Sequence, residues 1–257
     1  MDGGVFAILG ASGCGKSMTL KCIAGIERPN EGRIVLNDRV LFDSKKKINL
    51  PPQKRKVGYM FQDYALFPNM NVVQNIQAGM GRKPDQKKVQ EYIIGFQLTG
   101  LETHMPDQLS GGQKQRVAMA RMLAAEPELL LLDEPLSNLD TKLRVETRQE
   151  IRRIQKETGV TAIFVTHDQE EAMCISDEIV LMKDGAIQQV SSPTDIYMNP
   201  INKFVASFIG SPEMNFINVD LKNGVGTLDT LTMENLPKNK NKAIIGVRAE
   251  DFEVAEE

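Results

Sequence analysis

Apolar residues recur along much of the chain in two alternating patterns, short runs of β type and longer stripes at helical spacing. Residues 5–9 and 161–166 form short apolar runs, and residues 129–132 are all leucine, which is typical of a strand buried on both faces. Residues 16–26 and 139–156 carry the helical pattern. This alternation predicts an α/β fold, in which helices cover a sheet.

The middle of the chain follows a different pattern. Short β segments are expected at 33–36 and 57–61, but residues 63–109 are helical in pattern and are interrupted by glycines and a proline. We interpret this stretch as a helical insertion into the α/β unit, a helical subdomain over about 63–112.

A β-hairpin is predicted beyond the last long strand. Residues 178–183 and 186–190 flank Asp184-Gly185, and such a pair suits a two-residue turn in which both positions take positive φ. The hairpin therefore adds two strands that lie next to each other.

A domain boundary is expected shortly after this hairpin. Ser192 and Pro193 are typical of a helix cap and a first helical position, and after about Gly210 the helical pattern gives way to short β-like pieces. The prediction is a main domain over 1–210 and a partial β-domain over 211–257.

Composition narrows the classes of partner. The net charge of −3 argues against binding of nucleic acid through a broad basic surface. No apolar run approaches the roughly 18 residues of a membrane span, so no direct membrane insertion is expected. Nothing at the N-terminus resembles a signal peptide. The three cysteines show no CxxC spacing and are interpreted as reduced thiols.

A glycine-rich segment over residues 10–17 fits G-x-x-x-x-G-K-[ST] between a predicted strand and a predicted helix. Its glycines let backbone N–H groups converge on a phosphate chain at the positive end of a helix. Lys16 is expected to reach the β- and γ-phosphates, and the Ser17 hydroxyl to bind Mg²⁺. A fortuitous turn is the alternative, which the flanking elements disfavour. The candidate phosphate-binding residues are Gly10, Ser12, Gly13, Cys14, Gly15, Lys16 and Ser17.

Two adjacent acids, Asp133 and Glu134, end the leucine strand. The strands of a parallel sheet deliver their C-terminal residues to the ligand crevice, beside the phosphate loop. Asp133 then suits the Mg²⁺ shell, and Glu134 suits polarising an attacking water. A helix-capping pair is the structural alternative.

The segment Ser110-Gly111-Gly112-Gln113 combines a capping box with two glycines in the first helical turn. Glycine there costs helix stability, which makes sense if something must approach the backbone closely. An exposed helix start of this kind is a second candidate anion site.

Together these segments resemble the nucleotide-binding subunit of ABC transporters, in which Leu-Ser-Gly-Gly-Gln closes over ATP held by the partner's phosphate loop. The resemblance implies a P-loop NTPase core of ABC type with a helical subdomain and the start of a small, OB-like C-terminal regulatory β-domain. ATP and Mg²⁺ are the implied cofactors, and a second copy of the chain is the implied partner.

The resemblance also assigns roles to isolated residues. Gln62 matches the glutamine that links the Mg²⁺ and water site to the helical subdomain. Asp140 lies in the loop that crosses the dimer interface, and His167 matches the switch histidine at the γ-phosphate. Met18 stands where the family usually has threonine, which is expected to loosen the α-phosphate contact.

The implied reaction is in-line attack of water on the γ-phosphate. Lys16, His167 and Mg²⁺ would stabilise the developing charge while Glu134 orients and deprotonates the water. Ser110 and Gly112 would donate from the opposite subunit, so hydrolysis waits for two copies to close.

The resemblance further implies transport partners. Residues 65–70 resemble the segment that receives the coupling helix of a membrane subunit in bacterial importers, which implies a cytoplasmic location on the inner face of the membrane. Residues 210–217 and 246–251 are similar to carbohydrate and glycerol-phosphate importers, whereas residues 40–43 and 49–53 look more like molybdate or sulfate importers. The transported solute stays open.

Both ends of the chain look short beside the family. Its members usually begin earlier, with strands that carry an adenine-stacking aromatic residue, and their regulatory domain continues further. The expectation is weak ATP affinity relative to a chain with those strands. An idle cassette fragment is one alternative. A soluble, non-transport ABC ATPase is another. A kinase or GTPase gives no reason for the segment 110–113.

Overall fold

The computed structural model describes residues 3–137, 141–228, 231–234 and 239–252. The chain divides into two compact units, Met1–Pro193 and Thr194–Glu257, each described by itself below. The sequence predicted a boundary at Gly210, which lies later in the chain than the division at Pro193 and follows two short helices.

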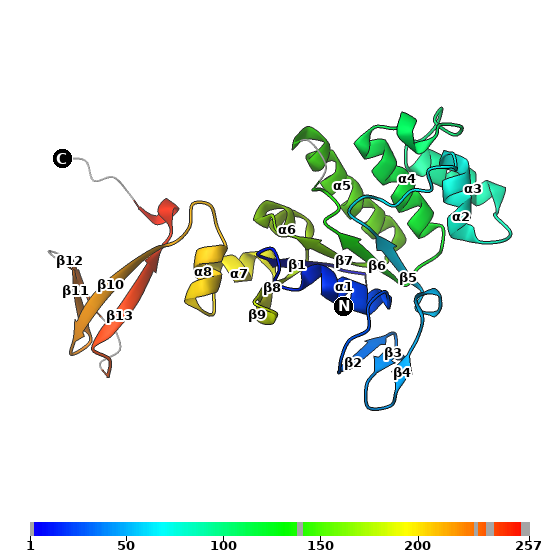
Figure 1. Cartoon of the computed structure of the whole chain (residues 1–257). Helices are drawn as coiled ribbons and strands as arrows, with labels where there is room; N and C mark the ends of the chain where they lie inside the picture. The colour runs from blue at the N-terminus through cyan, green and yellow to red at the C-terminus, as the bar shows by residue number, and fades with distance from the viewer. Residues whose placement is uncertain (1–2, 138–140, 229–230, 235–238, 253–257) are drawn as a thin grey trace. The chain divides into compact units, whose positions relative to one another are not determined.

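The first unit is built on a six-stranded sheet of order β5-β6-β7-β1-β8-β9 (Figure 1). Neighbouring strands from β5 to β8 run parallel, and β9 pairs antiparallel with β8. The strands are β1 (Val5–Gly10), β5 (Val57–Met60), β6 (Leu129–Asp133), β7 (Thr161–Thr166), β8 (Glu178–Lys183) and β9 (Ala186–Ser191). The predicted α/β fold is confirmed.

Helices α1 (Lys16–Ala24) and α6 (Gln169–Ile175) pack on this sheet, and α5 (Thr141–Thr158) packs on α6. The side chains of α1 pack on β1, β6 and β7 in one buried cluster that includes Leu20 and Leu131. This packing fixes the start of α1 at the carboxyl edge of the parallel strands, where ligands of such sheets bind.

A small antiparallel sheet of order β2-β3-β4 follows α1 in the chain. Its strands are β2 (Arg33–Leu36), β3 (Arg39–Asp43) and β4 (Ile48–Asn49). The sequence predicted only the first of them. The turn between β2 and β3 consists of Asn37 and Asp38, both at positive φ, which is the backbone of a tight hairpin.

The predicted helical subdomain, about 63–112, holds α2 (Val72–Met80) and α3 (Gln86–Gly95) and ends where α4 (Gly111–Leu123) begins; the three helices group together in Figure 1. Helices α2 and α4 approach each other closely at Gly79. A Cβ on this residue would lie 2.1 Å from the carbonyl oxygen of Arg121, so only glycine fits there. The residues described in this region form helices and turns, as the helical pattern predicted.

The second unit contains α7 (Pro193–Met198), α8 (Lys203–Phe208) and a four-stranded antiparallel sheet of order β12-β11-β10-β13. Its strands are β10 (Asn215–Lys222), β11 (Val225–Leu228), β12 (Leu231–Met233) and β13 (Lys242–Val247). The buried Arg248 guanidinium stacks 3.9 Å from the ring centroid of Tyr197 and donates to the Tyr197 carbonyl at 2.8 Å. Among the described residues, no helix of either unit is long and apolar enough to cross a membrane.

Helix α1 ends against a fully buried arginine. Arg55 donates to the carbonyls of Cys22 and Ile23 at 2.8 and 2.7 Å, which satisfies acceptors that the helix end leaves open. Gly25 caps the helix with φ 79°, and a Cβ there would lie 2.4 Å from the Arg55 Nε. The helix that follows the phosphate loop is therefore anchored at its C-terminal end.

We expect Gly25→Ala to lower the free energy of unfolding by more than Gly185→Ala. Both glycines have nearly the same φ, 79° and 78°, but a Cβ on Gly185 meets nothing within 4 Å. Left-handed backbone costs each alanine about 1–2 kcal/mol, and displacing Arg55 adds about 1–3 kcal/mol at Gly25 alone. Urea unfolding measures both; equal losses would contradict the proposed anchoring by Arg55.

Candidate nucleotide-hydrolysis site

The phosphate loop runs from the end of β1 to the first turn of α1. Gly13 and Gly15 take left-handed φ of 82° and 97°, and a side chain there would strain the turn. The buried Lys16 ammonium donates to the carbonyls of Gly10 and Ala11 at 2.8 and 2.9 Å. The loop therefore closes around its own lysine at the positive end of a helix, which is the arrangement that binds phosphate.

Ser17, Asp133 and Tyr59 form a hydrogen-bonded cluster beside this loop. The Ser17 hydroxyl donates to the Asp133 Oδ1 at 2.6 Å, and the Tyr59 hydroxyl donates to its Oδ2 at 2.8 Å. Burial raises the pKa of Tyr59, and the hydrogen bond to Asp133 raises it further, so the phenol stays a donor. Tyr59 was missed in the sequence.

The oxygen pair of Ser17 and Asp133 fits a magnesium ion. Mg²⁺ takes one or two protein oxygens and completes its shell with water and substrate phosphates. Among the described residues, no group of three or more His, Cys, Asp or Glu side chains gathers to hold a metal without such help. Gln62, the third residue predicted to bind the metal, is an exposed residue beyond β5.

We expect Tyr59→Phe to lower the free energy of unfolding by about 1.5–3 kcal/mol, because it removes a hydrogen bond to a charged carboxylate. The Mg²⁺ concentration that gives half-maximal ATP hydrolysis should rise, since Asp133 loses its hold on one side. Tyr92→Phe is the matched control, because Tyr92 donates to the neutral Leu123 carbonyl at 3.1 Å. An identical response of the two variants to Mg²⁺ would contradict this role of Tyr59.

Glu134 directly follows β6 in a left-handed conformation with φ 47°. Its backbone N–H donates to the Val165 carbonyl at 3.1 Å, and its carbonyl accepts from the Ser137 hydroxyl at 3.0 Å. The Glu134 Oε1 lies 3.4 Å from the His167 Nδ1, and the Gln62 Nε2 donates to the Ser137 hydroxyl at 3.3 Å. Gln62, Glu134 and His167 thus lie together. Ser137, the first residue of the segment 137–140 that was matched to the loop at the dimer interface, links Gln62 to the Glu134 turn.

The segment around Ser110 lies at the N-terminus of α4. Ser110 and Gln113 form the predicted capping box, with bonds of 2.8 Å and 3.4 Å, while Ser110 and Gly111 are exposed. No hydrogen bond among the described residues joins this helix start to Lys16, Ser17 or Glu134. The chain therefore presents two separate candidate phosphate sites.

The remaining predicted site residues differ in how far their side chains are exposed to solvent. Ser12 is exposed and Cys14 is buried, so Cys14 contributes packing to the loop. Met18 is 54% exposed, next to the phosphate loop. Asp140 lies outside the described residues.

Residues 65–70, predicted to contact a membrane subunit, form an exposed segment held from beneath by α2 and α4. Arg121 donates to the carbonyls of Tyr64 and Ala65 at 3.0 and 2.9 Å, and lies 5.0 Å from the Phe67 ring centroid. Asn75 Nδ2 donates to the Met70 carbonyl at 2.8 Å. The sequence had singled out neither Arg121 nor Asn75.

The fold and this geometry define a P-loop ATPase, and the helix start at Ser110 is a second candidate phosphate site. The ABC transporter family matches residues 1–137. The trehalose/maltose import ATP-binding protein MalK of Thermococcus litoralis is 42% identical, over 98% of this chain and 72% of the relative. The Fe(3+) ions import ATP-binding protein FbpC of Fusobacterium nucleatum is also 42% identical, over 99% of this chain and 69% of the relative.

A solved structure has the same fold. The ATP-binding cassette MJ0796, in a dimeric post-hydrolysis state bound to ADP and Pi, matches with a TM-score of 0.63 and 29% identity, over 75% of this chain and 87% of the other. This chain belongs to the ABC transporter family, as an ATP-binding cassette of the ATP-hydrolysing kind.

Proposed function

We propose that two copies of this chain bind ATP and Mg²⁺ head to tail and hydrolyse ATP to drive solute import through membrane permease subunits. The arrangement of Ser17, Asp133 and Glu134 carries the proposal, since oxygen ligands for Mg²⁺ lie next to a carboxylate that can receive a proton. The similarity to importer ATP-binding proteins and to a dimeric cassette supports the assembly.

Within one site, Lys16 and the N–H groups of the phosphate loop would bind the β- and γ-phosphates. Ser17 and Asp133 would hold Mg²⁺, which supplies charge that stabilises the phosphoryl group. Gln62 would bridge this metal site to the helical subdomain. Glu134 would orient the attacking water and accept its proton.

Two further groups complete the proposed site. His167, whose Nδ1 lies 3.4 Å from Glu134, would contact the γ-phosphate. The exposed N-terminus of α4, with residues 110–113, would donate to the ATP held by the other copy, and Asp140 would face the same interface. Each site then needs both chains, so hydrolysis depends on closure.

Residues 65–70 are the proposed contact with a permease. Because Arg121 of α4 holds this segment, movement at the permease would reach the helix that begins at Ser110. We also propose that residues 1–210 form the nucleotide-binding domain and that 211–257 belong to a regulatory β-domain. The place of action is the cytoplasmic face of the membrane.

ATP hydrolysis with and without metal tests the proposed chemistry. Purified chain should release phosphate from ATP in Mg²⁺ and stop when EDTA removes the metal. Undiminished hydrolysis in EDTA would contradict the roles of Ser17 and Asp133. Recovery of permease subunits with the wild-type chain, and their loss with Phe67→Asp, would support the contact through residues 65–70.

A further inference from the structure

Gln115 connects the helix that begins at Ser110 to the turn that carries Glu134. It lies on α4, is 1% exposed, and its Nε2 donates to the Pro135 carbonyl at 3.1 Å. Pro135 follows Glu134 directly in the chain. A buried amide hydrogen bond of this kind is costly to leave unmade, so the helix and the turn are held at a fixed separation.

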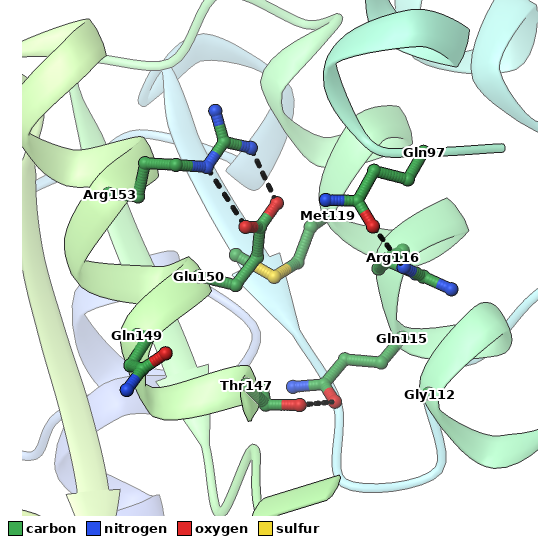
Figure 2. Close-up of a pocket in the computed structure, with 9 residues that line it drawn as sticks. All are labelled: Gln97, Gly112, Gln115, Arg116, Met119, Thr147, Gln149, Glu150 and Arg153. Carbon is green, nitrogen blue, oxygen red and sulfur yellow. Dashed lines mark hydrogen bonds and ion pairs between the residues drawn. The ribbon is translucent and has the colours of Figure 1, made fainter. Parts of the chain in front are cut away.

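The same side chain also meets α5. The buried Thr147 hydroxyl donates to the Gln115 Oε1 at 3.4 Å. Figure 2 shows the pair in a pocket of about 460 Å³ between α4 and α5. Among the nine described residues drawn there, this is the one bond that crosses between the two helices.

The Glu134 turn is thus held from two directions. Ser137 donates to the Glu134 carbonyl from within the turn, and Gln115 donates to the next carbonyl from α4. Glu134 sits at a φ of 47°, a conformation that persists only where surrounding contacts hold it. Loss of the Gln115 bond would therefore remove one contact that holds the turn and, with it, the direct link between the turn and α4.

We propose that Gln115 is a positioning residue that couples the two ATP sites of the dimer. This inference rests on the head-to-tail function proposed above. There, Glu134 acts on ATP bound to its own chain, whereas Ser110 acts on ATP bound to the other copy. Gln115 links these two groups within one chain through one side chain and one peptide carbonyl.

Mixed dimers with Gln115→Leu in one chain separate its effect on the Glu134 turn from its effect on the helix that begins at Ser110. In the first mixed dimer, one chain carries Gln115→Leu and the other chain carries only Glu134→Gln. The site that stays active then uses the Glu134 turn of the Gln115→Leu chain. If Glu134→Gln is instead in the same chain as Gln115→Leu, the remaining site uses that chain's Ser110 helix. Differently tagged chains allow each mixed dimer to be purified and its ATP turnover measured.

Turnover is expected to fall about 10–100-fold in both mixed dimers, because small displacements of a positioned group have effects of this size. The references are the same dimers with wild-type Gln115 and with Gln149→Leu, an exposed residue of the same pocket. ATP affinity of the isolated chain should not change, since Lys16 and its loop are untouched. Thr147→Val should give the same pattern with a smaller loss, which keeps the test open if Gln115→Leu does not fold.

A loss confined to the dimer that relies on the Ser110 helix would overturn the proposal, because Gln115 would then support only its own helix. No loss in either dimer would overturn it too. Formation of an ATP-dependent dimer by the Glu134→Gln chain is scored first. If that dimer does not form, the proposed function itself fails, and this outcome is distinct from unequal losses between dimers that do form.

Discussion

Glu134→Gln is expected to lower ATP turnover by about 10²–10⁴-fold, the usual contribution of a general base. Glutamine keeps the size of the side chain and its place after β6 but cannot accept the proton of the attacking water. The phosphate loop stays intact, so ATP should still bind. The variant should therefore accumulate as an ATP-bound dimer.

Single-turnover phosphate release and light scattering with ATP and Mg²⁺ measure the two parts of this prediction. Glu91→Gln on the exposed surface of α3 is the matched control and should hydrolyse ATP as the wild type does. Turnover within a few-fold of the wild type would contradict the role of Glu134. A variant that stays monomeric with ATP would contradict the dimer.

Lys16→Ala should nearly abolish turnover and also weaken ATP binding. Lys16 supplies a buried positive charge at the phosphate loop, and hydrogen bonds to charged groups contribute about 1.5–3 kcal/mol. The dissociation constant for ATP should therefore rise about 10–150-fold. In addition, turnover at saturating ATP should be about 10²–10³-fold below that of the wild type, which is the effect of losing one donor to the developing charge.

Fluorescent-nucleotide titration and phosphate release measure both effects. Lys21→Ala, on the same helix but away from the loop, is the control. An unchanged dissociation constant in Lys16→Ala would show that the ammonium does not contact phosphate. Glu134→Gln and Lys16→Ala thus differ in one respect, because only the second should lose affinity for ATP.

The main elements of the fold could be predicted because their signals are local. The leucines of β6 and the Asp184-Gly185 turn need no distant contact to be recognised, and Asp184 and Gly185 have positive φ in the structure. β4 was missed because it has only two residues. β3 was missed although its five residues make it longer than β2, which was predicted. The pairing of β3 with β2 depends on the Asn37-Asp38 turn, which was a usable signal.

The site residues likewise divide into those that a local pattern reveals and those that it does not. The P-loop spacing and the capping box of Ser110 are written in adjacent residues. The role of Tyr59 depends on the register of β5 against β6, where it lies opposite Leu131, two residues before Asp133. Nothing local to Tyr59 reveals that neighbour.

Gln115 and Arg121 were missed for a related reason. Both lie on α4, and both donate to backbone carbonyls of segments far away in the chain, those of Pro135 and of Tyr64 and Ala65. Backbone acceptors carry no side-chain signature, so a sequence pattern cannot indicate them. Such contacts become visible only when the helix is packed in place.

Mixing two inactive variants tests the central claim that each ATP site is built from two copies. Lys16→Ala removes the phosphate-loop lysine, and Ser110→Arg blocks the helix start that would face the other copy. Each variant alone should be inactive, whereas a mixture should recover ATP hydrolysis, because one intact site forms in each mixed dimer. A mixture as inactive as its components, or full activity of Ser110→Arg alone, would contradict the account.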